Sequence, residues 1–151
     1  MITSLMQSVV EEGTATAVQE LNRPAAGKTG TANEYRDAWF AGYTADYVAA
    51  AWVGFDDHAS MGRGETGSRA ALPIWLHFMK AAHEGLPPRD FDVPPGIETV
   101  RIDPLSGLLA GAQVPGRMEP FLEGTAPTME APPPDVIRPE DFFLHDQRSG
   151  L

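Results

Sequence analysis

A lysine, two threonines and a glycine follow one another in the segment Lys28-Thr29-Gly30-Thr31. A lysine ammonium attracts a carboxylate, and the hydroxyls of Thr29 and Thr31 can hydrogen-bond it. Gly30 leaves the backbone bare, so an extended peptide can lie alongside it as an added strand. Because donors already in position stabilise a developing oxyanion, this 28–31 segment is suited to bind a carboxylate beside a reacting carbonyl group.

Covalent acyl transfer also needs a nucleophile, and a serine activated by a lysine is one form of it. The sequence contains no Ser-x-x-Lys motif. The third residue after Ser4, Ser8, Ser60 and Ser68 is glutamine, glutamate, arginine and alanine, respectively. The sequence therefore predicts one wall of an active site without its nucleophile.

The composition limits the possible partners. The formal net charge of −10 over 151 residues argues against nucleic acid or an anionic membrane surface as a general partner, because both require a basic face. The absence of cysteine excludes disulfides and thiolate-metal sites. No apolar run is long enough to cross a membrane and residues 1–12 lack a basic start, so neither a membrane segment nor a signal peptide is predicted.

The first half of the chain predicts helices around a small sheet. Helical spacing of apolar residues predicts a helix over residues 2–12, and an alanine-rich stretch at 14–23 predicts a shorter one. Three strands are expected at residues 28–31, 38–43 and 47–55, the last two joined as an antiparallel hairpin. The continuous apolar run in the third strand favours burial on both faces.

A second long helix is expected to end near Gly85. Its expected buried stripe contains Leu72, Trp75, Leu76 and Met79, widened by Ile74, Phe78 and Ala82. The order of helix, strands and helix predicts an α+β fold, an antiparallel sheet flanked by helices, within residues 1–88. Three strands leave two open edges, which indicates that a further part of the sheet is missing.

The composition changes in the second half. Residues 89–128 are expected to form an appended unit, in which a turn at 103–107 joins short strands at 98–102 and 108–110. Residues 129–151 are acidic and proline-rich, which predicts a disordered tail.

Several residues that could do chemistry have a simpler interpretation. A nucleotide phosphate loop would need a glycine at Asn22 and a helix after Thr29, so it is not predicted. Asp56, Asp57 and His58 are consecutive in a turn and rarely converge on a metal, so no metal site is expected. Three tryptophans are assigned to the core, and two histidines to surface or packing positions: Trp39, Trp52, Trp75, His77 and His83.

Four linked blocks carry a family resemblance. They are residues 26–31, 37–43, 52–57 and 62–67, the last followed by 70–75. In this order they resemble the last part of the transpeptidase domain of a class A (bifunctional) penicillin-binding protein, in which a Lys-Thr-Gly element accompanies Ser-x-x-Lys. Residues 101–108 and 121–125 resemble the C-terminal extension of that family, so the resemblance covers about residues 1–128.

The resemblance implies a partial β-lactamase/transpeptidase-like fold and acyl transfer from D-Ala-D-Ala stem peptides to an acceptor amine. Lys28 and Thr31 would be the catalytic residues, the latter through its backbone N–H in the oxyanion hole. Lys28, Thr29, Gly30 and Thr31 would bind the substrate or a β-lactam. No cofactor is implied. The implied location is the periplasmic face of the bacterial inner membrane, and the implied partner is an N-terminal part of the same protein that carries the serine.

Two alternatives stay open. The chain is a fragment of such a transpeptidase, inactive by itself, or a stand-alone module that binds a peptide or carboxylate. A fragment of a β-lactamase or D,D-carboxypeptidase would carry the same Lys-Thr-Gly wall. The block at residues 62–67 and the long extension favour the bifunctional enzyme.

Overall fold

A computed structural model describes residues 1–133 of the chain. The chain divides into two compact units, with the division between Val93 and Pro94. Within the described residues, no helix combines the length and apolar character needed to cross a membrane.

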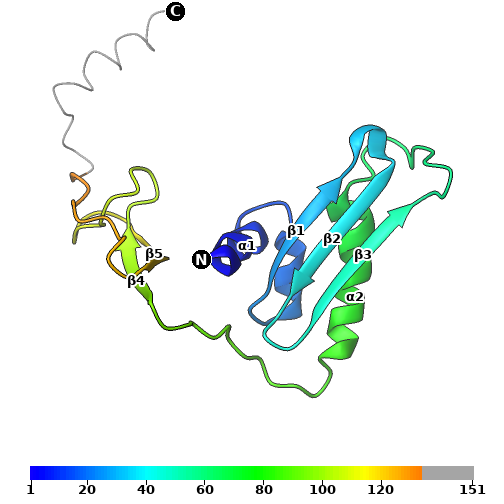
Figure 1. Cartoon of the computed structure of the whole chain (residues 1–151). Coiled ribbons are helices and arrows are strands. Elements are labelled where there is room, and N and C mark those ends of the chain that lie inside the picture. The colour runs from blue at the N-terminus through cyan, green and yellow to red at the C-terminus, as the bar shows by residue number, and fades with distance from the viewer. Residues whose placement is uncertain (134–151) are drawn as a thin grey trace, which may run out of the picture. The chain divides into compact units, whose positions relative to one another are not determined.

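The first unit is a three-stranded antiparallel sheet with helices, as the sequence predicts (Figure 1). The strand order is β1-β2-β3, so β2 is central and both outer strands have a free edge within this unit. The elements in chain order are α1 (Ile2–Glu11), η1 (Thr16–Leu21), β1 (Ala26–Thr31), η2 (Asn33–Tyr35), β2 (Asp37–Tyr43), β3 (Val48–Gly54), η3 (Gly67–Ala71) and α2 (Leu72–Ala82).

One face of this sheet, hereafter the covered face, packs against α2, which runs behind the strands in Figure 1. Ala38 and Phe40 of β2 have no exposed surface, and Trp75 of α2 is 1% exposed. The rings of Phe40 and Trp75 meet edge to face at 4.9 Å between centroids, a favourable aromatic geometry. The indole N–H of Trp75 donates to the carbonyl of Ala49 at 3.0 Å, so the largest side chain of the core is also hydrogen-bonded.

The other face, hereafter the open face, carries Trp39 and Trp52. These side chains are 48% and 41% exposed, so assigning them to the core was wrong, whereas the assignment of Trp75 is confirmed. They lie opposite each other on β2 and β3. Burial of β3 on both faces is also not found within the described residues, because exposure alternates along this strand and α2 covers one side of it.

The helix α2 begins at Leu72 after a single π-helical turn, η3, and Pro73 lies in its first turn. This position suits proline because the first N–H groups of a helix have no intrahelical partner. Four members of the predicted stripe are buried: Leu72, Trp75, Leu76 and Met79. Ile74 and Phe78 are more than half exposed, so widening the stripe to include them was wrong.

His83, directly after α2, ties this helix to the β2–β3 turn. Its Nδ1 lies 2.7 Å from the carbonyl oxygen of Met79, and its Nε2 lies 2.9 Å from Oγ1 of Thr44. The hydroxyl of Thr44 also accepts the backbone N–H groups of Asp46 and Tyr47, at 3.2 Å each. The network therefore assigns the Thr44 hydroxyl as donor to Nε2 and Nδ1–H as donor to Met79, which satisfies a buried ring.

The second unit contains the antiparallel pair β4 (Ile97–Ile102) and β5 (Arg117–Leu122). The prediction of a strand at 98–102 is confirmed. The expected hairpin with 108–110 is present only as one antiparallel bridge, with hydrogen bonds from Asp103 N–H to Leu108 and from Ala110 N–H to Arg101. The longer pairing of β4 is with β5, which the sequence did not predict. Leu109 makes only isolated bridges, to Ile102 and to Glu130. The pairing of β4 with β5 spans a connection of more than ten residues, and local turn signals do not reveal such a pairing.

The turn after β4 is closed by Asp103. Its carboxylate accepts the hydroxyl of Ser106 at 2.6 Å and the backbone N–H of Leu105 at 3.1 Å. The Ser106 hydrogen bond, followed by that from Leu105, lowers the pKa of Asp103 from its ordinary value of 3.8.

The beginning of the predicted tail is hydrogen-bonded to this unit. Leu109 N–H donates to Met129 at 2.9 Å, and Ala131 N–H donates to Leu109 at 2.8 Å. Disorder is therefore not found at residues 129–131. The rest of the predicted tail, residues 134–151, lies outside the described residues.

Candidate functional site

The 28–31 segment forms the C-terminal part of β1, an outer strand of the sheet. Its neighbour on one side is β2, with Lys28 opposite Ala41 and Thr31 opposite Ala38. On its other side β1 has no partner strand among residues 1–133. An extended ligand could therefore pair with this edge through its backbone.

The register determines which backbone groups point to the free edge. Ala32 N–H donates to the carbonyl of Asp37 at 2.9 Å, directly beyond the end of the paired strands. Hydrogen-bonded and non-hydrogen-bonded pairs alternate in an antiparallel ladder. Since Ala32 is hydrogen-bonded to β2, the backbone N–H and C=O of Gly30, two residues earlier, also point to β2. The backbone N–H and C=O of Thr29 and Thr31 therefore point away from β2. Thr31 N–H is thus directed outward at the free edge.

The side chain of Lys28 lies on this edge and is exposed. Its Nζ donates to the backbone carbonyl of Thr29 at 3.0 Å, which agrees with the outward direction of that carbonyl. Within the described part of the chain no ion pair involves Lys28. An exposed ammonium that bonds only a neutral carbonyl is available to an anionic ligand at modest cost.

The two threonine side chains alternate with Lys28 and project to the other face of β1. The hydroxyl of Thr29 lies 2.9 Å from the hydroxyl of Thr14, in the connection between α1 and η1. Oγ1 of Thr31 accepts the backbone N–H of Gly67 at 3.1 Å. Two segments distant in sequence therefore hold the strand from the side opposite Lys28.

Gly30 lies on the same face as Lys28, next to Trp39. A β-carbon added at Gly30 would lie 3.2 Å from Cβ of Trp39, a tight contact. The bare backbone predicted at this position therefore also has a packing reason, because the opposite residue is a tryptophan.

The other residues considered for chemistry do not converge on this edge. The side chain of His77 is exposed, and His83 is buried directly after the end of α2. Among residues 1–133 no cluster of three or more histidine, aspartate or glutamate side chains could hold a metal ion.

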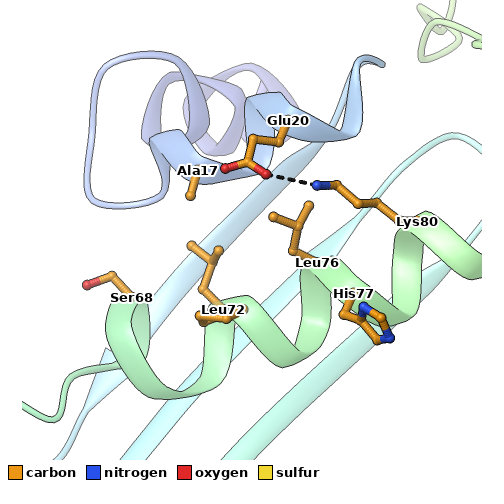
Figure 2. A pocket seen from close by; sticks show the side chains of 8 residues that line it. Ala17, Glu20, Ser68, Leu72, Leu76, His77 and Lys80 are labelled. Carbon is orange, nitrogen blue, oxygen red and sulfur yellow. Dashed lines mark hydrogen bonds and ion pairs between the residues drawn. The ribbon is translucent and has the colours of Figure 1, made fainter.

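A hollow of about 330 Å³ lies between η1 and α2 (Figure 2). Leu72 and Leu76 form its apolar wall, and the ion pair of Glu20 with Lys80, 2.8 Å long, crosses one end of it. Its lining includes no residue of the 28–31 segment. This hollow is separate from the candidate edge.

The sequence predicts the 28–31 segment but not the two residues that hold it, Thr14 and Gly67. Gly67 belongs to the glycine-rich block at 62–67, so the block itself was a signal. Nothing in the spacing pairs it with Thr31, because 36 residues separate the two. Thr14 carried no sequence signal.

Comparison with known proteins identifies the family. Residues 1–80 match the model of the penicillin binding protein transpeptidase domain, and residues 93–130 match the C-terminal domain of penicillin-binding protein 1A. The chain belongs to the penicillin-binding protein transpeptidase family.

Individual relatives agree with this assignment. Penicillin-binding protein 1A of Pseudomonas aeruginosa is 43% identical over 137 residues, which are 89% of this chain and 17% of that protein. The Escherichia coli K12 protein of the same name is 42% identical over 123 residues, 72% of this chain and 14% of that protein. The chain thus spans about a sixth of the length of these relatives.

A solved structure shares the fold. The crystal structure of penicillin-binding protein 1A from Haemophilus influenzae superposes with a TM-score of 0.76 at 37% sequence identity, covering 85% of this chain and 20% of that one. The predicted α+β fold of the transpeptidase type is therefore confirmed.

Proposed function

We propose that this chain supplies the substrate-binding wall of a serine-type D,D-transpeptidase that cross-links peptidoglycan. The observation that carries the proposal is the free edge of β1, where an exposed lysine and an outward backbone N–H lie along the same short strand in a chain of this family. The wall would bind the D-Ala-D-Ala end of a stem peptide as an added strand.

Each group has a defined task in the proposed reaction. A serine hydroxyl attacks the carbonyl of the penultimate D-Ala, an ester bond forms, and the terminal D-Ala leaves with a proton on its amine. An acceptor amine of a neighbouring stem peptide then attacks the ester, forms the new amide and returns the hydroxyl to serine. Lys28 would attract the terminal carboxylate, and Thr31 N–H would donate to the oxyanion at each step.

The hydroxyls of Thr29 and Thr31 have a second task besides the carboxylate contacts predicted for them. They bond to Thr14 and Gly67 on the side away from Lys28. The hydroxyl of Thr31 accepts the N–H of Gly67 and can still donate its own hydrogen to the ligand carboxylate, so the two tasks are compatible. A β-lactam, as a mimic of D-Ala-D-Ala, would use the same edge.

The nucleophile would come from outside these 151 residues, because they contain no Ser-x-x-Lys motif. The open face and the free edge of β3 are the surfaces that further protein from the same domain would cover, since both expose apolar side chains or unpaired backbone groups. The location that follows from this proposal is the periplasmic side of the bacterial inner membrane.

Lys28→Ala tests the proposal in a complete protein that contains the chain. We expect its acylation by a fluorescent penicillin to slow by about 10- to 100-fold, since a hydrogen bond to a charged group contributes about 1.5–3 kcal/mol. The circular dichroism spectrum should stay unchanged because Lys28 is exposed. Lys80→Ala is the matched control, because Lys80 is another exposed lysine and lies on α2, outside the 28–31 segment.

The isolated 151-residue chain distinguishes this proposal from a stand-alone binding module. We expect no covalent labelling of it by the same penicillin, because it lacks the serine motif. Covalent labelling of the isolated chain, or an unrelated gene directly upstream of Met1, would contradict the proposal. Hydrolysis of penicillin by the complete protein at a high rate would instead indicate a β-lactamase.

A further inference from the structure

Gly67 approaches the backbone of the candidate edge from outside the sheet. This residue is buried at the start of η3 and lies against Gly30 of the 28–31 segment. A β-carbon added at Gly67 would overlap the carbonyl oxygen of Trp39 and lie 2.6 Å from the carbonyl oxygen of Gly30. It would also lie 3.0 Å from the nitrogen of Gly30. The contact is therefore between backbone and backbone, with no flexible side chain that can move away.

Space, rather than backbone conformation, explains the glycine at this position. Gly62 and Gly64 in the same loop have φ values of +109° and +90°, in the left-handed region that favours glycine. Gly67 is not among the described glycines with positive φ. Any residue could adopt its backbone conformation, but only glycine fits against the Gly30–Trp39 pair.

The helix behind the sheet holds Gly67 in place. The carbonyl of Thr66 accepts the backbone N–H groups of Arg69 at 3.0 Å and Ala70 at 2.8 Å, which anchors the start of η3. This turn continues directly into α2, whose buried residues belong to the core. The position of Gly67 is thus determined by a helix that belongs to the core of the unit.

From this position Gly67 contacts Gly30 and Thr31, the two residues joined by the peptide bond whose N–H points outward. Its own N–H donates to Oγ1 of Thr31, and its α-carbon faces the peptide of Gly30, which is covalently joined to the nitrogen of Thr31. An error of about 1 Å in a catalytic group can reduce a rate by about 10²-fold. A substitution that displaces this peptide would therefore displace the oxyanion donor.

We propose that Gly67 is a positioning residue for the reaction: because it has no side chain, α2 can hold the Gly30–Thr31 peptide and direct Thr31 N–H toward the oxyanion. This inference rests on the function proposed for the 28–31 segment. Gly67 touches no substrate in this account and acts only through β1.

The first test is Gly67→Ala in a complete protein that contains the chain, with penicillin acylation measured at increasing concentrations. We expect the acylation rate constant at saturation to fall by about 10²-fold. The half-saturating concentration should change less than about threefold, because oxyanion contacts act in the transition state. The matched control is Gly111→Ala, where the added β-carbon would lie 3.6 Å from the nearest atom, and it should react at the wild-type rate.

The outcomes separate the two proposals. Acylation of Gly67→Ala at the wild-type rate, or a loss found entirely in the half-saturating concentration, would overturn the positioning role. Failure of the wild-type protein to react would contradict the proposed function instead.

A second measurement, on the 151-residue chain without penicillin, is independent of activity and of the folding of Gly67→Ala. Hydrogen exchange at the Gly67 amide should quicken about tenfold in Thr31→Val, which removes the acceptor, and stay unchanged in Thr31→Ser, which keeps it. In Thr31→Val the amide resonances of Gly30 and Thr31 should also shift. Equal exchange in both variants would show that the contact does not hold the strand.

Discussion

The two faces of the small sheet are made by the same three strands and differ in almost every physical respect. On the covered face Phe40 is fully buried and touches Trp75 of α2. On the open face the preceding residue of the strand, Trp39, is 48% exposed, and its ring lies near that of Trp52, with ring centroids 6.3 Å apart. Lys28 belongs to the open face, and Thr31 belongs to the covered one.

The difference shows how one edge strand can combine stability with binding. The covered face fixes the position of β1 through packing and through the contacts of Thr14 and Gly67 with its threonines. The open face and the free edge leave Lys28 and the N–H of Thr31 accessible. A rigid scaffold on one side therefore positions reactive groups on the other.

Phe40→Ala should give the largest effect on stability. We expect it to reduce the free energy of unfolding by about 3–5 kcal/mol, because it leaves a cavity against Trp75. Trp39→Ala removes a larger side chain from the adjacent position and should cost only about 1 kcal/mol. Urea denaturation of both variants measures the contrast. Equal losses would mean that the open face is as well packed as the covered one.

Thr44→Val should give an intermediate effect. The valine keeps the shape of threonine but leaves Nε2 of His83 without its partner in a buried site, at a cost of about 1–3 kcal/mol. Thr16→Val, at an exposed position of η1, is the control and should change the unfolding free energy by less than about 0.5 kcal/mol. A loss no larger than that of the control would show that α2 does not depend on this hydrogen bond.

Ser106→Ala, in the second unit, should give the smallest effect. Removing the hydroxyl should raise the pKa of Asp103 toward 3.8, because the Ser106 hydrogen bond is the main cause of its lowering. A lowered pKa stabilises the folded unit above the unfolded pKa of 3.8, and this stabilisation is lost as the pH falls through the folded pKa. An NMR titration of the Asp103 carboxyl measures the shift, with Thr99→Ala as control. An unchanged midpoint in Ser106→Ala would assign the lowering to the backbone N–H groups.

Much of the first unit could be predicted because its signals are local. The strand at residues 28–31, the hairpin that follows it and the buried stripe of α2 all depend on residues close in sequence. The faces of Trp39 and Trp52 could not be predicted, since residues 38–41 and 48–53 are apolar without interruption and give no period of two. The pairing of β4 with β5 was missed for a related reason, because a long connecting loop does not determine which strand becomes the partner.

By itself, the sequence determined the family, the α+β class and the segment that carries the candidate chemistry, because four short blocks occur in a specific order. Only the tertiary structure decided how that segment is presented. Strand order left the edge of β1 free, the register directed Thr31 N–H outward, and α2 brought Gly67 against Gly30. These features arise from contacts between residues far apart in the chain, and their geometry is set by packing rather than by local preference.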